Sequence, residues 1–139
     1  MSRRNLLLIG FLLMGCSEQE PRGVCGESFC LPSTAKFIEK TTPIDFNLYQ
    51  LEWKGDRFGI YEGNNPQRDL AGRSTKLRLT MDRSATLHVS GGRGRVLVQV
   101  KTECRIGEDC GPQYLDVAGP CRSSEQCQVR DFAAQLSRR

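Results

Sequence analysis

The placement of the cysteines restricts this chain more than any other feature, and there are seven of them in 139 residues. Six form three close pairs: Cys25 and Cys30, Cys104 and Cys110, and Cys121 and Cys127. The residues within each pair are turn-prone, and a short loop costs little entropy to close. We therefore predict a small domain held by these three local disulfides, each contributing about 2–3 kcal/mol, although six cysteines allow other connectivities.

A metal site is the alternative use of these cysteines. Zinc ligands normally come as cysteines separated by about two to four residues, whereas Cys104, Cys110, Cys121 and Cys127 form pairs with wider gaps. The Cys-x-x-Cys spacing of redox-active dithiols does not occur either. We expect structural disulfides and neither a metal nor another cofactor.

The seventh cysteine, Cys16, ends an apolar run at the N-terminus. Arg3 and Arg4 precede the run, which extends from Leu6 to Gly15. As a helix this run would measure about 15 Å, which is half of the roughly 30 Å hydrocarbon core of a bilayer. A basic start followed by a short apolar segment is typical of a signal peptide rather than of a resident membrane span.

The segment Leu13-Met14-Gly15-Cys16 resembles the lipobox of bacterial lipoproteins, although Met14 is less typical at its position. The resemblance implies a signal peptide at 1–15, cleavage after Gly15, and acyl chains on Cys16 that anchor the protein permanently. By resemblance to enterobacterial lipoproteins, Ser17 after the cysteine implies sorting to the outer membrane. The alternatives are an ordinary secretory signal with a chance cysteine, or a buried N-terminal helix.

The resemblance ends at Cys16 and says nothing about the rest of the chain. Residues 16–24 are polar and contain Pro21 and Gly23, so we expect a lipidated tether with a reach of about 15 Å. Residues 25–139 are predicted to form a single β-rich domain close to the membrane surface. An exported compartment permits the predicted disulfides.

Alternating apolar residues predict two hairpins. In the first, the phase slips between Leu48 and Tyr49, which predicts a β-bulge or bend there. A turn at 54–57 would place Trp53 opposite Phe58 and Leu51 opposite Ile60. The second hairpin covers 76–89 and is followed by a glycine-rich turn at 91–95.

Further elements follow toward the C-terminus. The run Val96–Lys101 predicts a central strand buried on both faces, and Tyr114–Ala118 a short further strand. Apolar residues at helical spacing then predict a C-terminal helix: Val129, Phe132, Ala133 and Leu136. Ser123 with Gln126, or Ser124, would cap the helix, and Arg138 and Arg139 would complement its dipole. The expected fold is a mainly β, antiparallel sandwich or barrel of about six or seven strands.

Charge is distributed unevenly along the chain. The formal net charge is +4 and falls to +2 without the signal peptide, so it gives no indication of a nucleic-acid partner. Residues 68–95 carry seven basic against two acidic side chains, whereas residues 103–125 carry two basic against five acidic. We predict a basic binding face formed by Lys76, Arg78, His88, Arg93 and Arg95. It suits anionic lipid headgroups, an anionic glycan or an acidic envelope protein, and the alternative is an ordinary solvated strand face.

Catalytic signals are weak. His88 is the only histidine, and no nucleophile motif accompanies it. Carboxylates remain open as acid–base pairs, either Glu52, Asp56 and Glu62 near the first hairpin, or Glu103, Glu108 and Asp109 in the second cysteine loop. We expect a non-enzymatic, membrane-anchored binding module of the bacterial envelope. The alternatives are a structural part of an envelope complex, a lipoprotein inhibitor of a lysozyme or protease, and a carboxylate-dependent hydrolase.

Overall fold

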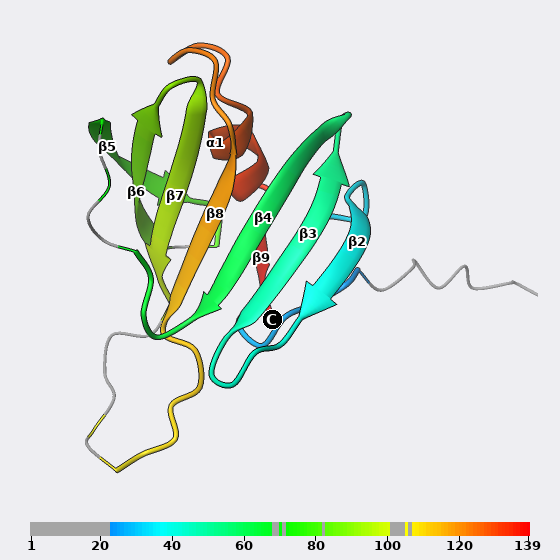
Figure 1. Ribbon diagram of the computed structural model, residues 1–139, viewed down its shortest axis with the longest axis vertical. Coiled ribbons are helices and arrows are strands. Elements are labelled where there is room, and N and C mark those ends of the chain that lie inside the picture. The colour runs from blue at the N-terminus through cyan, green and yellow to red at the C-terminus, as the bar shows by residue number, and fades with distance from the viewer. Residues whose placement is uncertain (1–22, 68–69, 71, 82, 101–104, 106) are drawn as a thin grey trace, which may run out of the picture.

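The computed structural model describes residues 23–67, 70, 72–81, 83–100, 105 and 107–139. The predicted signal peptide, Cys16, Glu103 and Cys104 lie outside this part of the chain. The fold is mainly β, as predicted, with one short C-terminal helix (Figure 1). No helix within the described residues is both long enough and apolar enough to cross a membrane.

Seven antiparallel strands form one sheet in the order β2-β3-β4-β8-β7-β6-β5 (Figure 1). The strands are β2 (Lys36–Thr41), β3 (Asn47–Trp53), β4 (Asp56–Gly63), β5 (Arg73–Leu79), β6 (Arg83–Ser90), β7 (Arg93–Gln99) and β8 (Tyr114–Pro120). A second, two-stranded sheet pairs β1 (Phe29–Cys30) with β9 (Ser137–Arg138). Because β2 and β5 are the two ends of the strand order, the large sheet is open.

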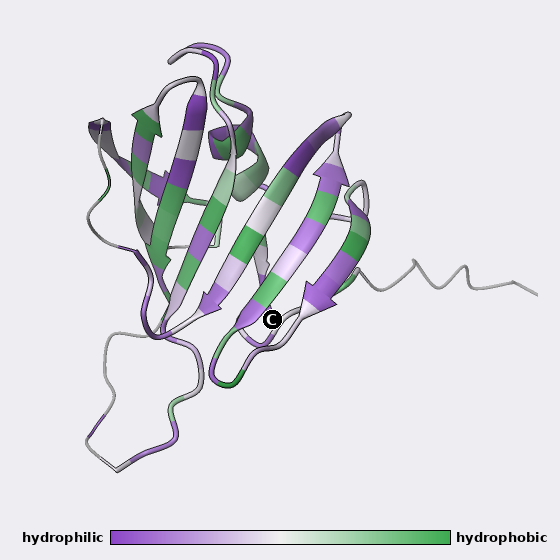
Figure 2. Ribbon diagram, in the orientation of Figure 1, coloured by the Kyte–Doolittle hydropathy of each residue, from purple (hydrophilic) through white to green (hydrophobic). Residues whose placement is uncertain are grey.

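The core lies on one side of the large sheet, here called the inner face. Apolar residues alternate with polar ones along its strands (Figure 2), which places the apolar set on the inner face. The helix α1 (Gln128–Ala133) packs against β7 and β8 on this face. Its Phe132 stacks on Phe58 with ring centroids 4.6 Å apart and also contacts Trp53. A second apolar contact, between Phe29 of β1 and Tyr49 of β3, brings the small sheet over the same face.

The strands β4 and β8 join the two halves of the large sheet. They pair only from Gly59 to Gly63 of β4, and beyond this stretch they separate with α1 behind the gap (Figure 1). Phe58 lies against Gly119 at the point of separation, where an added Cβ would stand 2.4 Å from the phenyl ring. The absence of a side chain at position 119 therefore lets Phe58 reach α1.

The first hairpin forms where predicted, but its predicted register is wrong by two residues. Leu51 pairs with Phe58 and Tyr49 with Ile60, around a two-residue turn at Lys54 and Gly55. Both turn residues have positive φ, 52° and 82°, which suits the right-handed twist of a tight hairpin. Strand parity is preserved by a shift of two, so the predicted apolar face is correct.

The predicted bulge in the first hairpin is also misplaced. Leu48 and Tyr49 are consecutive residues of a regular β3, and Ile44 lies before the strand rather than in it. The register shift occurs instead in β2, between Phe37 and Glu39. The phase slip in the sequence therefore marks the start of β3 and not an irregularity within it.

The second hairpin is formed by β5 and β6, and the glycine-rich turn shrinks to Gly91 and Gly92. The predicted burial of the Val96 strand on both faces is wrong, because β7 alternates and Leu97 is only half-buried. The strand predicted at Tyr114 is present as β8 and extends to Pro120.

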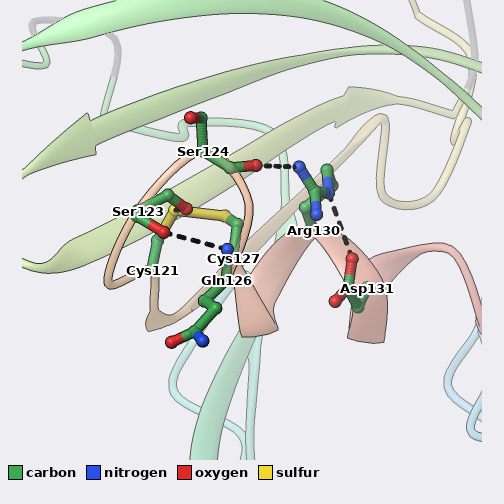
Figure 3. The surroundings of a disulfide bond; sticks show 7 residues. All are labelled: Cys121, Ser123, Ser124, Gln126, Cys127, Arg130 and Asp131. Carbon is green, nitrogen blue, oxygen red and sulfur yellow. Dashed lines mark hydrogen bonds and ion pairs between the residues drawn. A yellow bond between two sulfur atoms is a disulfide. The ribbon is translucent and has the colours of Figure 1, made fainter.

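The predicted ends of the C-terminal helix are wrong. Cys127 is the N-cap residue and makes no side-chain cap bond. Ser123 accepts a hydrogen bond from the Gln126 N–H at 3.0 Å within the preceding loop (Figure 3). Arg138 lies in β9 and donates to the Met81 carbonyl, and Arg139 donates to the Gly26 carbonyl, so neither arginine complements the helix dipole.

Two of the predicted disulfides are confirmed, Cys25–Cys30 and Cys121–Cys127 (Figure 3). The first closes the loop before β1, and the second closes the loop that leads into α1. Cys110 is also disulfide-bonded, and its predicted partner Cys104 lies outside the described residues.

Candidate binding surface

The predicted basic residues lie on the face of the large sheet opposite the core, here called the outer face. Lys76 and Arg78 alternate with inward-facing Leu77 and Leu79 along β5. His88 of β6 stands opposite Arg95 of β7 in the strand register. The structure thus brings the predicted set onto one face, spread over three neighbouring strands, with Arg93 following the same parity as Arg95.

Arg95 is held in place by a neighbouring carboxylate. Its guanidinium makes a bidentate ion pair with Asp116, and the Arg95 Nε to Asp116 Oδ1 distance is 3.0 Å. Its Nη1 also donates to Gln67 Oε1 at 2.9 Å. Burial lowers the pKa of Arg95, although a guanidinium stays charged at any working pH. This arrangement orients the side chain and neutralises much of its charge.

Two hollows adjoin on the outer face where β3, β4, β8 and β7 lie side by side. The larger, of about 440 Å³, is bordered by Leu48, Tyr61, Gln67, Arg95 and Asp116. The smaller, of about 210 Å³, is bordered by Ile38, Arg57 and Arg93. Both include Gln50 and Gly59, so together they form one shallow depression, here called the outer groove.

Small residues form the floor of the outer groove. Gly59 pairs directly with Ala118 across the β4–β8 junction. A Cβ added at Gly59 would find only the Tyr49 carbonyl oxygen within 4 Å, at 3.9 Å. The floor is therefore open to an incoming group rather than filled by the protein itself.

The walls of the outer groove carry cations that can bind an anion. Arg57 and Arg93 are exposed, and within the described residues neither makes an ion pair. Guanidinium groups match the planar geometry of carboxylates and the oxygens of phosphates or sulfates. The groove is therefore suited to an anionic group that spans the distance between these two arginines and Arg95.

Glu62, at the end of β4, is a buried carboxylate. The sequence pattern groups it with Glu52 and Asp56 as an acid near the first hairpin and does not reveal its burial or its hydrogen-bond partners. The Glu62 side chain is 0% exposed. It accepts hydrogen bonds from Ser28 Oγ at 2.6 Å, the Ser28 N–H at 2.9 Å and the Glu27 N–H at 3.1 Å. Tyr49 OH donates to it at 2.9 Å and Asn47 Nδ2 at 3.3 Å. The sequence does contain a signal for this burial. Glu62 follows Phe58 and Ile60 at intervals of two residues, so it shares their inward-facing positions along β4.

The hydrogen bonds decide the ionisation of this group. Burial alone would raise the pKa of Glu62, but the donors at Ser28, Glu27 and Tyr49 outweigh it and hold the pKa below its ordinary value. Burial, and then the hydrogen bond to Glu62, raises the pKa of Tyr49. A general acid needs a pKa near the working pH, so Glu62 is suited to holding structure rather than to proton transfer.

Glu62 also forms the wall of an acidic hollow of about 310 Å³, together with Glu27, Asp45 and Asp109. Of the other acids predicted near the hairpin, Glu52 lies on the outer face of β3 and Asp56 is 3.8 Å from Arg122. Glu108 is exposed in the second cysteine loop. Within the described residues, no group of three or more His, Cys, Asp or Glu is placed to hold a metal ion.

A fold does not by itself identify a ligand, so any inference about binding rests on the chemistry of the site. That chemistry is an arginine-walled groove on one face and an acidic hollow at the end of β4. Comparisons with protein-family models, with curated proteins and with solved structures find no match to this chain.

Proposed function

We propose that the chain is a lipid-anchored protein of the bacterial envelope whose β domain binds an anionic partner without catalysing a reaction. The observation that carries the binding role is the outer groove, an open floor at Gly59 and Ala118 bordered by Arg57, Arg93 and Arg95. The anchoring role rests on the resemblance of Leu13–Cys16 to a lipobox.

Arginine positioning supports a binding surface over a merely solvated face. Arg95 is fixed by Asp116, so little side-chain entropy remains to be lost when a ligand reaches it. Asp116 neutralises much of the charge of Arg95, so Arg57 and Arg93 supply the net positive charge of the groove. The combination provides one oriented donor and two cations around a hollow that no side chain fills.

The test uses the full chain and two double variants of equal net charge. Arg57→Glu with Arg93→Glu reverses the groove, and Lys54→Glu with Arg73→Glu reverses two exposed charges elsewhere. Each is bound to an immobilised anionic polysaccharide and eluted with salt. We expect the groove variant to bind about tenfold more weakly than the control variant, because each exposed charge pair contributes up to about 1 kcal/mol.

Equal elution of the two double variants would show that net charge alone drives retention and would overturn the groove proposal. The anchor is tested separately by Cys16→Ala, which we expect to release the chain from the membrane fraction. Retention of the Cys16→Ala variant in that fraction would overturn the anchor.

A further inference from the structure

Within the described part of the chain, the exposed large apolar side chains come from one stretch of the sequence. Among the described residues, every large hydrophobic side chain that is exposed falls between positions 24 and 48: Val24, Phe37, Ile38, Ile44 and Leu48. Ile44 is the most exposed of them, in the loop that joins β2 to β3. None lies on the β5–β7 half, where the basic residues are.

The strand β2 presents apolar groups at an open edge of the large sheet. All six of its residues are exposed. The register shift after Phe37 leaves Phe37 opposite inward-facing Leu51, while Ile38 borders the outer groove. Both sides of the edge are therefore apolar in the middle of the strand. Charged side chains and the register shift protect this edge against pairing with another strand, but they leave Phe37 and Ile38 exposed.

The start of the described chain indicates what covers this edge. The described chain begins at residue 23, and its first segment, coloured blue, lies on the β2 side of the molecule (Figure 1). Seven peptide steps separate this point from Cys16, which is about 25 Å even when fully extended. If Cys16 carries acyl chains, the β2 side is the part of the domain that the anchor holds nearest to the headgroups. Lys36 precedes the apolar pair, and Glu39 and Lys40 follow it, so charged side chains border the part that would enter the interface.

We propose that the β2 edge is a membrane-contact surface, with Phe37 and Ile38 inserted at the level of the lipid headgroups and Ile44 beside them. This inference rests on the proposed lipid anchor. Lys76 and Arg78 lie on β5, at the opposite end of the strand order, so this part of the basic face points away from the bilayer. The outer groove, which Ile38 borders, lies next to the contact surface.

The experiment places a photoreactive benzoyl-phenylalanine in the full chain, in membranes, at one of two exposed positions. Ile38 is the test position and Lys76 is the matched control on the opposite edge. After irradiation, intact-mass analysis distinguishes adducts with phospholipid, with a second copy of the chain and with another protein. We expect at least a tenfold excess of lipid adduct at position 38 over position 76.

The remaining outcomes overturn the inference. A protein or self adduct at position 38 would make β2 a docking edge for a polypeptide, and equal lipid labelling at both positions would mean that the domain has no fixed orientation. A Cys16→Ala version run in parallel separates the two proposals. If it stays in the membrane fraction, the anchor fails; if it is released and position 38 of the anchored chain still gives no lipid adduct, only the membrane-contact surface fails.

Discussion

At the scale of single residues, Glu62 ties together parts of the chain that are distant in sequence. Its carboxylate binds the backbone of the first disulfide loop at Glu27 and Ser28, and the side chains of Asn47 and Tyr49 on β3. Each of these groups would lose a charged acceptor if the carboxylate were removed. A buried donor without an acceptor costs more than an average hydrogen bond contributes.

The first prediction concerns stability. Glu62→Gln should lower the free energy of unfolding by about 3 kcal/mol, because the amide NH₂ group faces donors and cannot accept from them. Urea denaturation measures the change. Glu52→Gln on the outer face of β3 is the matched control and should change stability by less than about 0.5 kcal/mol. Similar losses in the two variants would contradict the structural role of Glu62.

The second prediction concerns pH. The folded pKa of Glu62 lies below its unfolded value, so in acid the unfolded state binds the proton more readily than the folded state does. Its stabilisation is complete above the unfolded carboxyl pKa of about 4.3 and is lost as pH falls from there through the folded value. The stability difference between wild type and Glu62→Gln should therefore shrink below about pH 4. A difference that stays constant into acid would contradict it.

At the scale of elements, the β4–β8 junction contains two glycines with opposite surroundings. Gly119 faces the core and its missing side chain makes room for Phe58, whereas Gly59 faces the outer groove and open space. The two strands pair over five residues, and beyond this stretch Phe58 passes Gly119 and stacks on Phe132 of α1.

The third prediction compares alanine at these two positions. Gly119→Ala should destabilise the protein by about 1–3 kcal/mol, because a Cβ there stands 2.4 Å from the Phe58 ring. Gly59→Ala should leave thermal stability within about 0.5 kcal/mol, because its methyl group meets only an ordinary contact. Thermal unfolding of both variants is the measurement, and equal destabilisation would refute the difference between the two faces.

The alternation of apolar and polar residues predicts which segments form strands. It predicts less well which residues of neighbouring strands pair with one another. The apolar face of the first hairpin follows from a period of two, which a register shift of two residues leaves unchanged. The turn was misplaced because Asp56 and Arg57, although polar, pair with Trp53 and Glu52 as the first residues of β4. The basic residues that the sequence groups together do lie on one face of the sheet. The floor at Gly59 and Ala118 depends on the pairing of β4 with β8, which local patterns do not encode.

At the scale of the whole molecule, the two described disulfides differ in their access to solvent. Cys121 and Cys127 are 1% and 0% exposed, whereas Cys25 is exposed and Cys30 is half-buried. Thiol–disulfide exchange requires an attacking thiolate to reach a sulfur atom. The difference in burial therefore predicts different rates of reduction for the two disulfides.

The fourth prediction follows from this difference. Under native conditions a mild thiol reductant should open Cys25–Cys30 before Cys121–Cys127. Alkylation at timed intervals followed by peptide mass analysis identifies which thiols appear. The same experiment in denaturant is the control, because the difference should vanish once the chain is unfolded. Earlier labelling of Cys121 and Cys127 in the native protein would contradict the prediction.

The pairing of β1 with β9 has a consequence for the order in which the protein is made. Phe29 pairs with Arg138, so β1 can form its sheet only after residues 137–138, more than 100 positions later, have been made. Contacts between such distant residues form slowly, because a long loop must close before they stabilise anything. A chain still on the ribosome or still crossing a membrane lacks β9. Completion of the fold therefore comes after β9 has been made, and loss of β9 would leave β1 without its strand partner.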